Sequence, residues 1–198
     1  MGREVRAADP DGNGARLKFT ELPLRGSYLV EPEPLGDARG FLARTFCARE
    51  FGERGLETNY VQCNTTFNPA RGTLRGLHWQ SAPHEEAKLL RCTAGAVYDV
   101  IVDLRAGSPT RGRWHALELS ARNRRMLYIP KGFAHGLQTL EPDTELFYQM
   151  SAYYVAEAKH GLRWDDPALA IPWPLREALV GDADRALPTL AQLQAKST

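Results

Sequence analysis

The sequence predicts an all-β domain, an antiparallel sandwich or jelly-roll barrel with short peripheral helices, and two observations support this fold class. About ten short strand-like runs follow one another closely with turn-forming residues between them, and helical periodicity is scarce. The chain of 198 residues also suits one domain with a sizeable core. We therefore expect a single domain over residues 16–198, preceded by a disordered, charged tail over residues 1–15.

The strands are predicted from hydrophobic alternation and from the turn residues that separate them. They are Ser27–Glu31, Phe41–Cys47, Tyr60–Phe67, Thr73–Gln80, Ala87–Cys92, Ala96–Asp103, Arg113–Leu119, Arg125–Ile129, Ala134–Thr139 and Thr144–Met150. The stretch Pro32–Gly40 reads as turn-forming, and Asn68–Gly72 suits a hairpin between the strands on either side of it. We expect a short helix over Ala48–Gly55, and loops with brief helices outside the barrel from Asp166 onward.

The clearest alternation lies in the segment from Ala96 to Leu104. One face carries only apolar residues, namely Ala96, Tyr98, Val100, Val102 and Leu104. The opposite face alternates the apolar residues Val97 and Ile101 with Asp99 and Asp103. This pattern predicts a strand with one buried face.

Composition disfavours several classes of function. Lys and Arg number 25 against 24 Asp and Glu, so the chain lacks the basic excess of a general nucleic-acid or membrane-surface binder. No apolar run approaches the roughly 20 residues needed to cross a bilayer, and residues 1–15 contain no signal-peptide core. The three cysteines, Cys47, Cys63 and Cys92, form no CxxC pair, which predicts reduced thiols and a cytoplasmic location.

Two segments carry most of the residues capable of chemistry. Gly72–Gln80 contains a glycine followed after five residues by His78, and Ile129–Gly136 contains the pattern P-x-G-x-x-H that ends at His135. Together they resemble the two signatures of the cupins, which are double-stranded β-helix proteins. In metal-binding cupins the first signature continues H-x-H, but Gln80 stands at the second histidine position. A metal site of His78, His135 and either Glu85 or Glu86 stays open as an alternative.

Further motifs occur in order over most of the chain, from about Leu17 to Leu190, and resemble the dTDP-4-dehydrorhamnose 3,5-epimerase family. They are Asp37–Phe41, Gln62–Asn64, Leu74–Gln80, Ala87–Leu89, Asp99–Arg105, Ile129–Gly136, Phe147–Tyr148, Trp164–Pro167 and Asp184–Pro188. The resemblance implies an isomerase of deoxysugar biosynthesis that epimerises a nucleoside-diphosphate 4-keto-6-deoxy sugar at C3, C5 or both. It also implies a homodimer in which an N-terminal strand is exchanged between subunits, and the segment near Asp37–Phe41 suits that role.

Epimerisation beside a ketone requires a base, and the resemblance assigns this role to His78. A histidine has a pKa near neutrality, and a carboxylate on its other ring nitrogen would fix the tautomer and stabilise the imidazolium. Asp184 is the expected carboxylate, with Asp166 and Asp182 as alternatives. No metal or organic cofactor is expected, because the ketone of the substrate is itself the electron sink.

The resemblance places Lys88 beside the developing enolate oxygen and makes Tyr148 the general acid on the far face of the sugar. Five further residues are expected to contact the sugar and the nucleotide: Arg39, Gln62, Asn64, Arg75 and His135. Other interpretations stay open for two catalytic and two binding candidates. Lys88 could be a solvated lysine and Tyr148 a core aromatic, while Arg39 could form a hairpin salt bridge and His135 could cap a turn.

Strand geometry raises one difficulty for this assignment. In a regular strand over Thr73–Gln80, His78 and Gly76 share one face while Arg75 points to the other. A bulge or a glycine-driven twist at Gly76 would bring Arg75 to the same side as His78.

Four positions depart from the family pattern and are expected to lie in or near the substrate pocket. Arg44 and Cys63 replace acidic residues, and Gln149 and Ala183 replace lysines. The sequence therefore leaves open which nucleotide and sugar are bound. Two rival functions also stay open: a metal-dependent cupin dioxygenase or isomerase, and a non-catalytic cupin that binds nucleotide sugars.

Overall fold

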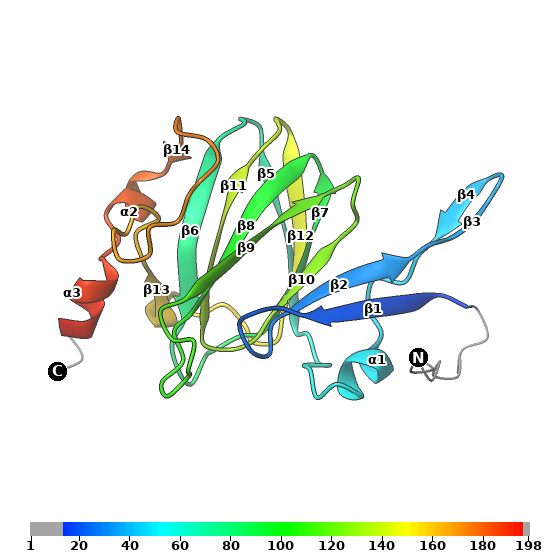
Figure 1. Ribbon diagram of the computed structural model, residues 1–198, viewed down its shortest axis with the longest axis horizontal. Coiled ribbons are helices and arrows are strands. Elements are labelled where there is room, and N and C mark those ends of the chain that lie inside the picture. The colour runs from blue at the N-terminus through cyan, green and yellow to red at the C-terminus, as the bar shows by residue number, and fades with distance from the viewer. Residues whose placement is uncertain (1–13, 196–198) are drawn as a thin grey trace, which may run out of the picture.

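The computed structural model describes residues 14–195 and shows two antiparallel sheets packed face to face as a jelly roll (Figure 1). The prediction of an all-β fold with short peripheral helices is therefore confirmed. The first sheet has the strand order β1-β2-β10-β7-β12-β5. Its strands are β1 (Arg16–Glu21), β2 (Tyr28–Glu33), β5 (Gln62–Asn68), β7 (Lys88–Ala94), β10 (Met126–Ile129) and β12 (Thr144–Met150).

The second sheet has the order β13-β6-β11-β8-β9, and β14 pairs with β6 in parallel. Its strands are β6 (Thr73–Gln80), β8 (Ala96–Asp103), β9 (Trp114–Ser120), β11 (Phe133–Thr139), β13 (Lys159–Gly161) and β14 (Leu179–Val180). A separate hairpin of β3 (Leu35–Asp37) and β4 (Gly40–Leu42) extends away from the barrel beyond β2 (Figure 1). The helices are α1 (Ala48–Gly52), η1 (Ala156–Ala158), α2 (Asp182–Arg185) and α3 (Leu190–Ala195).

The main core lies between the two sheets and is built from alternate residues of strands in both. Its fully buried members include Val97 and Ile101 of β8, Leu127 of β10 and Leu146 of β12. Burial of these side chains supplies the main driving force that holds the sheets together.

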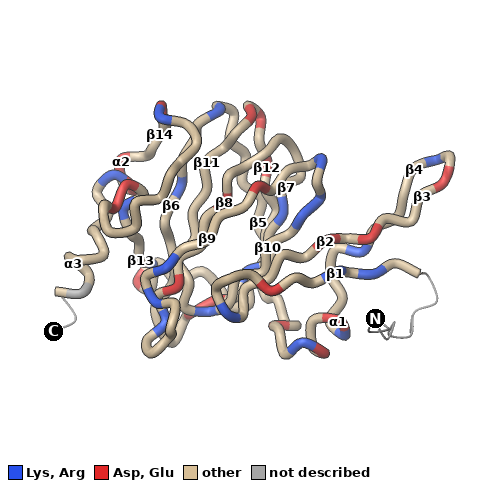
Figure 2. The backbone as a smooth tube through the Cα atoms, viewed as in Figure 1, with Lys and Arg blue, Asp and Glu red and all other residues tan. Residues whose placement is uncertain are grey.

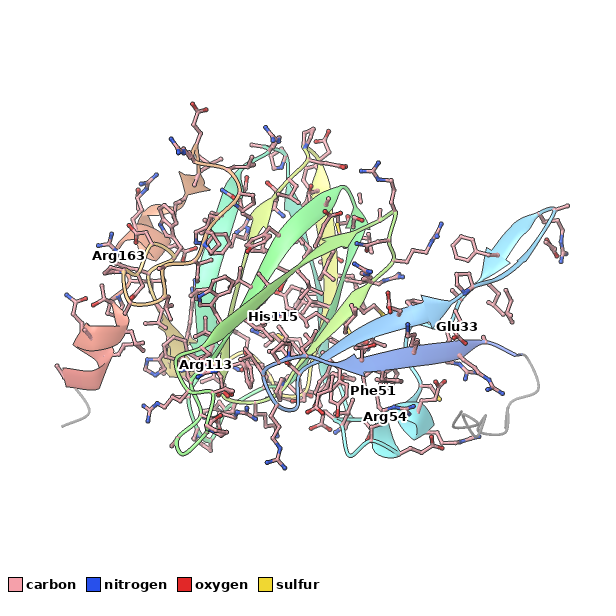
Figure 3. The ribbon with its side chains drawn as sticks, in the orientation of Figure 1. Glu33, Phe51, Arg54, Arg113, His115 and Arg163 are labelled. Carbon is pink, nitrogen blue, oxygen red and sulfur yellow. The ribbon has the colours of Figure 1, made fainter. Side chains whose placement is uncertain are left out.

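Two smaller clusters cover the outer faces of the sheets. Phe51 of α1 (labelled in Figure 3) is fully buried against the first sheet. Its ring lies 5.1 Å from that of Phe19 and 5.0 Å from that of Phe46. On the second sheet, the C-terminal segment packs Leu169 and Ile171 onto the outer faces of β6, β8 and β11. This packing brings α2, which follows β14, to the edge of β6.

The prediction of a single buried face for Ala96–Asp103 is wrong, because β8 is buried on both sides. Its wholly apolar face, which includes Val100 and Val102, points outward and is covered by the C-terminal segment. Its mixed face points into the barrel, so Asp99 and Asp103 are fully buried. Hydrogen bonds offset the cost of burying them.

The predicted hairpin between Tyr60–Phe67 and Thr73–Gln80 is also wrong. The strand β5 pairs with β12 in the first sheet, whereas β6 pairs with β11 in the second. The turn at Asn68–Gly72 therefore carries the chain from one sheet to the other. Turn residues mark such a connection in the same way as they mark a hairpin.

Most other predicted boundaries agree to within two residues, and Thr73–Gln80, Ala96–Asp103 and Thr144–Met150 match their strands. The predicted strand Phe41–Cys47 is shorter, because pairing in β4 ends at Leu42, and the predicted helix Ala48–Gly55 ends at Gly52. Four short strands, β1, β3, β13 and β14, are present that the sequence does not predict. Of the predicted tail, residues 1–13 lie outside the described residues, and Ala15 is buried.

Charge is distributed over the whole fold, with both signs alternating along the chain (Figure 2). Within residues 14–195, no helix has the length and apolar character to span a membrane.

A β-bulge interrupts β6 where it passes β11. His78 pairs with His135 and Arg75 pairs with Leu137, so Gly76 and Leu77 together face the single residue Gly136. Gly76 has φ = +113°, a conformation that glycine adopts without steric cost. The extra residue resets the alternation, and Arg75 and His78 consequently point to the same side. The bulge anticipated at Gly76 is thus present.

The close approach at this bulge leads to a prediction for Gly76→Ala. A Cβ at position 76 would lie 2.6 Å from Gly136 Cα and 2.8 Å from the carbonyl oxygen of His135. We expect the substitution to lower the free energy of unfolding by more than about 1 kcal/mol, measured by urea denaturation. The matched control is Gly107→Ala, where φ is +75° but an added Cβ meets no described atom within 4 Å. Equal losses in the two variants would show that the contact with β11 is unimportant.

Candidate active site

A cavity of about 490 Å³ opens between the two sheets. Its wall is formed by β5, β7 and β12 of the first sheet and by β6, β11 and β13 of the second. Seven of the nine residues predicted for the site line it: Gln62, Asn64, Arg75, His78, Lys88, His135 and Tyr148. Of the other two, Asp184 contacts a lining residue from outside the wall, and Arg39 lies elsewhere.

His78 and Asp184 form a close pair on the wall made by the second sheet. His78 Nε2 lies 2.7 Å from Asp184 Oδ1, and Asp184 Oδ2 accepts a 3.1 Å hydrogen bond from the backbone N–H of Gly76. Burial raises the pKa of Asp184, but these hydrogen bonds outweigh it and hold the pKa below its ordinary value. Because a carboxylate only accepts, Nε2 carries the proton of this contact, which leaves the lone pair of a neutral imidazole on Nδ1.

The two alternative carboxylates do not reach His78. Asp166 is buried, and its oxygens accept hydrogen bonds from the backbone N–H groups of Ala168 at 2.8 Å and Leu190 at 2.6 Å. Asp182 is exposed in the first turn of α2. Asp166 therefore anchors the C-terminal segment, and Asp184 is the carboxylate placed against the histidine.

Lys88 and Tyr148 lie on the opposite wall, in neighbouring strands of the first sheet. Lys88 begins β7 and its Nζ lies 2.9 Å from Glu86 Oε1. Tyr148 of β12 is partly buried and faces the cavity between Leu90 and Asn64 of the adjacent strands. Neither residue is a solvated surface side chain.

The environment of Tyr148 disfavours its phenolate form. Burial raises the pKa of Tyr148, and Glu86 adds to this effect, whereas the Arg75 cation and a hydrogen bond with Asn64 partly oppose it. The net pKa is raised. The hydroxyl therefore keeps its proton at neutral pH, as a general acid requires.

His135 pairs with the buried Asp99 instead of capping the turn at Gly132. His135 Nε2 lies 3.0 Å from each carboxylate oxygen of Asp99, which is fully buried on the neighbouring strand. Burial raises the pKa of Asp99, and the opposing effects of His135 and Lys88 compensate only in part.

Three polar residues complete the wall near the bulge and β5. Arg75 Nε donates a 2.8 Å hydrogen bond to Asn68 Oδ1. Gln62 Nε2 donates to Asn64 Oδ1 at 3.3 Å. These groups place amide and guanidinium hydrogen-bond donors beside the catalytic candidates.

Arg39 does not reach the cavity of its own chain. It lies in the turn of the β3–β4 hairpin, where its side chain is 89% exposed and forms an ion pair with Asp37. This contact keeps the pKa of Asp37 below its ordinary value. The hairpin salt bridge that the sequence left open as an alternative is thus present.

The departures from the family pattern lie outside the cavity wall, although Cys63, Gln149 and Ala183 each adjoin a residue of the site. Arg44, Cys63 and Gln149 do not line its wall. Arg44 instead forms a 2.7 Å ion pair with Glu50 of α1. Cys63 is exposed, because it alternates with Gln62 and Asn64 along β5. Ala183 adjoins Asp184 in α2.

Glu86 is the main feature of the site that the sequence does not predict correctly. The sequence suggests it only as a metal ligand, yet it forms an ion pair with Lys88 in the cavity wall. The spacing of two residues between Glu86 and Lys88 is a signal that they lie together, because alternate residues of an extended segment share a face. Lys159 and Tyr154 also line the cavity, and we find no sequence signal for either. Among residues 14–195, no three His, Cys, Asp or Glu side chains are arranged to hold a metal ion.

Comparison with known proteins gives consistent matches. The dTDP-4-dehydrorhamnose 3,5-epimerase family model matches residues 21–192. A protein of Sinorhizobium fredii described as dTDP-4-dehydrorhamnose 3,5-epimerase is 42% identical over 178 residues, which are 89% of this chain and 91% of that protein.

Two solved structures share the fold. The dTDP-4-dehydrorhamnose 3,5-epimerase of Bacillus anthracis, solved with TDP and PPi bound, superposes with a TM-score of 0.86 at 42% identity, covering 88% of this chain and all of that one. NovW of Streptomyces spheroides, a 4-keto-6-deoxy sugar epimerase, gives a TM-score of 0.88 at 33% identity and covers 92% of each chain. These matches confirm the predicted double-stranded β-helix fold.

The raised pKa of Tyr148 can be tested by titration. The phenolate absorbance of Tyr148 is the difference between the wild-type and Tyr148→Phe spectra. We expect this difference to titrate with a pKa above the ordinary tyrosine pKa of 10.0. In an Arg75→Met background the same difference should move to still higher pH, because Arg75 lowers the pKa of Tyr148. A difference signal that titrates at or below the ordinary value would contradict this account of the site.

Proposed function

Since the chain belongs to the dTDP-4-dehydrorhamnose 3,5-epimerase family, it is an isomerase of a dTDP-linked 4-keto-6-deoxy sugar in deoxysugar biosynthesis, and we propose that it works through the residues of the cavity. The observation that carries the proposal is the placement of a histidine–carboxylate pair on one wall and of Lys88 and Tyr148 on the other. We also infer a cytoplasmic location, which is supported by the free thiols of Cys47, Cys63 and Cys92.

His78 is the proposed base. Its unprotonated Nδ1 accepts the proton from the carbon beside the ketone, and the electron pair of the broken C–H bond moves onto the ketone oxygen as an enolate. The imidazolium that forms donates a hydrogen bond from its Nε2–H to Asp184, and the proton stays on the ring. The adjacent carboxylate stabilises this cation and keeps the ring in one orientation.

Lys88 and Tyr148 are the proposed partners on the opposite side of the sugar. The Lys88 ammonium stabilises the enolate oxygen, which is the atom that gains charge. The Tyr148 hydroxyl then donates its proton to the same carbon from the other face, so the configuration inverts without net oxidation or reduction. The phenolate regains a proton and His78 releases one before the next turnover.

The remaining wall residues are proposed to hold the substrate. Arg75 offers guanidinium N–H groups suited to a diphosphate, while its Nε is held by Asn68. Gln62, Asn64 and His135 are proposed to contact the sugar and the nucleotide. The TDP and PPi bound to the Bacillus anthracis relative support a nucleoside-diphosphate ligand.

The first experiment is incubation with dTDP-4-keto-6-deoxyglucose in D2O, with deuterium at C3 and C5 followed by NMR. We expect incorporation that persists in chelator and that falls between about 100-fold and 10,000-fold in His78→Ala, because the general base is lost. Asp184→Asn should also slow the exchange, since an amide cannot accept from both Gly76 and His78. Asp182→Asn is the control, because Asp182 is exposed in the same helix and does not reach His78.

Three results would count against the proposal. Binding of the nucleotide sugar without exchange by folded wild-type protein would favour a non-catalytic binding cupin. Loss of exchange in chelator would favour a metal-dependent enzyme. Exchange that survives in His78→Ala would remove the histidine from the role of base.

We further propose a homodimer in which the β3–β4 hairpin reaches the cavity of the partner subunit. The hairpin extends from the barrel (Figure 1). It leaves the side chains of Phe41 and Leu42 53% and 56% exposed. Exposed apolar side chains of this size are typical of interaction surfaces. Arg39 lies at the tip of the hairpin and outside the cavity of its own chain. A partner's cavity would give it a nucleotide to contact.

Mixing two inactive variants tests this arrangement. A heterodimer of Arg39→Ala and His78→Ala has one complete site if Arg39 serves the partner's cavity, and none if it serves its own. Random exchange of subunits should then restore about a quarter of wild-type activity, because half of the dimers carry one intact site of two. Failure to regain activity, with subunit exchange verified by mass spectrometry, would contradict the exchange of the hairpin.

A further inference from the structure

Glu86 is a buried carboxylate whose position the mechanism above does not explain. Its side chain is only 3% exposed at the wall of the cavity, and Oε1 lies 2.9 Å from Lys88 Nζ. Removing a carboxylate and an ammonium from water is costly unless both are well paired. A hydrophobic pair would fill the same space at lower cost, so the retained charges point to a function.

Gln80 holds the second oxygen of Glu86. Gln80 Nε2 donates a 2.9 Å hydrogen bond to Glu86 Oε2 and also lies 3.0 Å from the carbonyl oxygen of His84. Gln80 Oε1 accepts a 2.6 Å hydrogen bond from the backbone N–H of Val155. These contacts fix the orientation of the amide, because Nε2 faces acceptors and Oε1 faces a donor.

We propose that Glu86 is a positioning residue, held by Gln80, that fixes the Lys88 ammonium where the enolate oxygen forms. This inference rests on the proposed function and adds a residue to it. A free lysine side chain samples many rotamers, so aligning its charge during the reaction would cost entropy. An ammonium has three N–H donors, and the contact with Glu86 uses one of them. The others stay available to the ketone oxygen, and a fixed cation stabilises developing charge without reorganisation.

The geometry makes Glu86→Gln an informative change. A carboxylate accepts hydrogen bonds at both oxygens, from Lys88 on one side and from Gln80 on the other. A glutamine in the same place has one oxygen, so its NH₂ group would face either the Lys88 ammonium or the Gln80 amide donor. Either arrangement sets two donors against each other and releases Lys88 from its position.

We expect Glu86→Gln to lower kcat between about 10-fold and 100-fold with KM for the dTDP-4-keto sugar changed by less than about threefold. A misplaced catalytic group affects the transition state more than ground-state binding. The control is Glu85→Gln, which removes the same charge from the neighbouring, partly exposed residue and should leave both constants unchanged. Thermal unfolding of each variant checks that the fold is intact.

A double-mutant cycle with Lys88→Met separates positioning from a structural role. If Glu86 acts through Lys88, adding Glu86→Gln to Lys88→Met should change kcat by less than about twofold. A further tenfold loss in that background, or a Glu86→Gln enzyme as active as Glu85→Gln, would overturn the proposal. If Glu86→Gln does not fold, Glu86→Asp replaces it: the charge is kept but shortened, and unchanged kcat would refute positioning. Inactive wild-type protein would instead overturn the proposed function, and the role of Glu86 would fall with it.

Discussion

The contact between the backbones of β6 and β11 determines much of the site. Gly76 and Gly136 approach so closely that a Cβ on Gly136 would lie 2.7 Å from the carbonyl oxygen of Arg75. The resulting bulge turns Arg75 and His78 toward the same cavity. It also frees the backbone N–H of Gly76 from the ladder, and Asp184 accepts it. One local irregularity therefore places a cation, a base and the carboxylate that orients the base.

The two-sheet architecture separates the proposed base from the proposed acid. His78 belongs to the sheet that contains β6 and β11, whereas Lys88 and Tyr148 belong to the sheet that contains β7 and β12. A sugar lying between the sheets has one face toward each. Inversion at carbon needs proton removal and return from opposite faces, and the two sheets provide this separation.

The sequence predicted the fold class and most of the strands, because alternation and turn residues are local signals. It failed where tertiary packing decides the outcome. The apolar face of β8 predicted a strand that turns this face to the core of the barrel. Instead, the C-terminal segment covers that face from outside. The mixed face enters the barrel, where Asp99 pairs with His135 and Asp103 pairs with Arg105. The hairpin predicted around Asn68–Gly72 failed because a turn does not specify which sheet its second strand joins. Arg39 matched the family motif, but a motif does not show which subunit's cavity its side chain serves.

Three ionisable side chains of the wall each lie against a carboxylate before any substrate is present: His78 against Asp184, Lys88 against Glu86, and His135 against Asp99. Proton transfer from carbon to His78 would create an imidazolium and an enolate while leaving the total charge of the cavity unchanged. The imidazolium would form against Asp184, and the enolate would form within reach of Lys88. Each new charge would thus arise beside an opposite charge already held in place, where a low dielectric strengthens the attraction. Pairing therefore lowers the desolvation cost of burying these groups. It also lowers the free energy of the charges that the proton transfer creates.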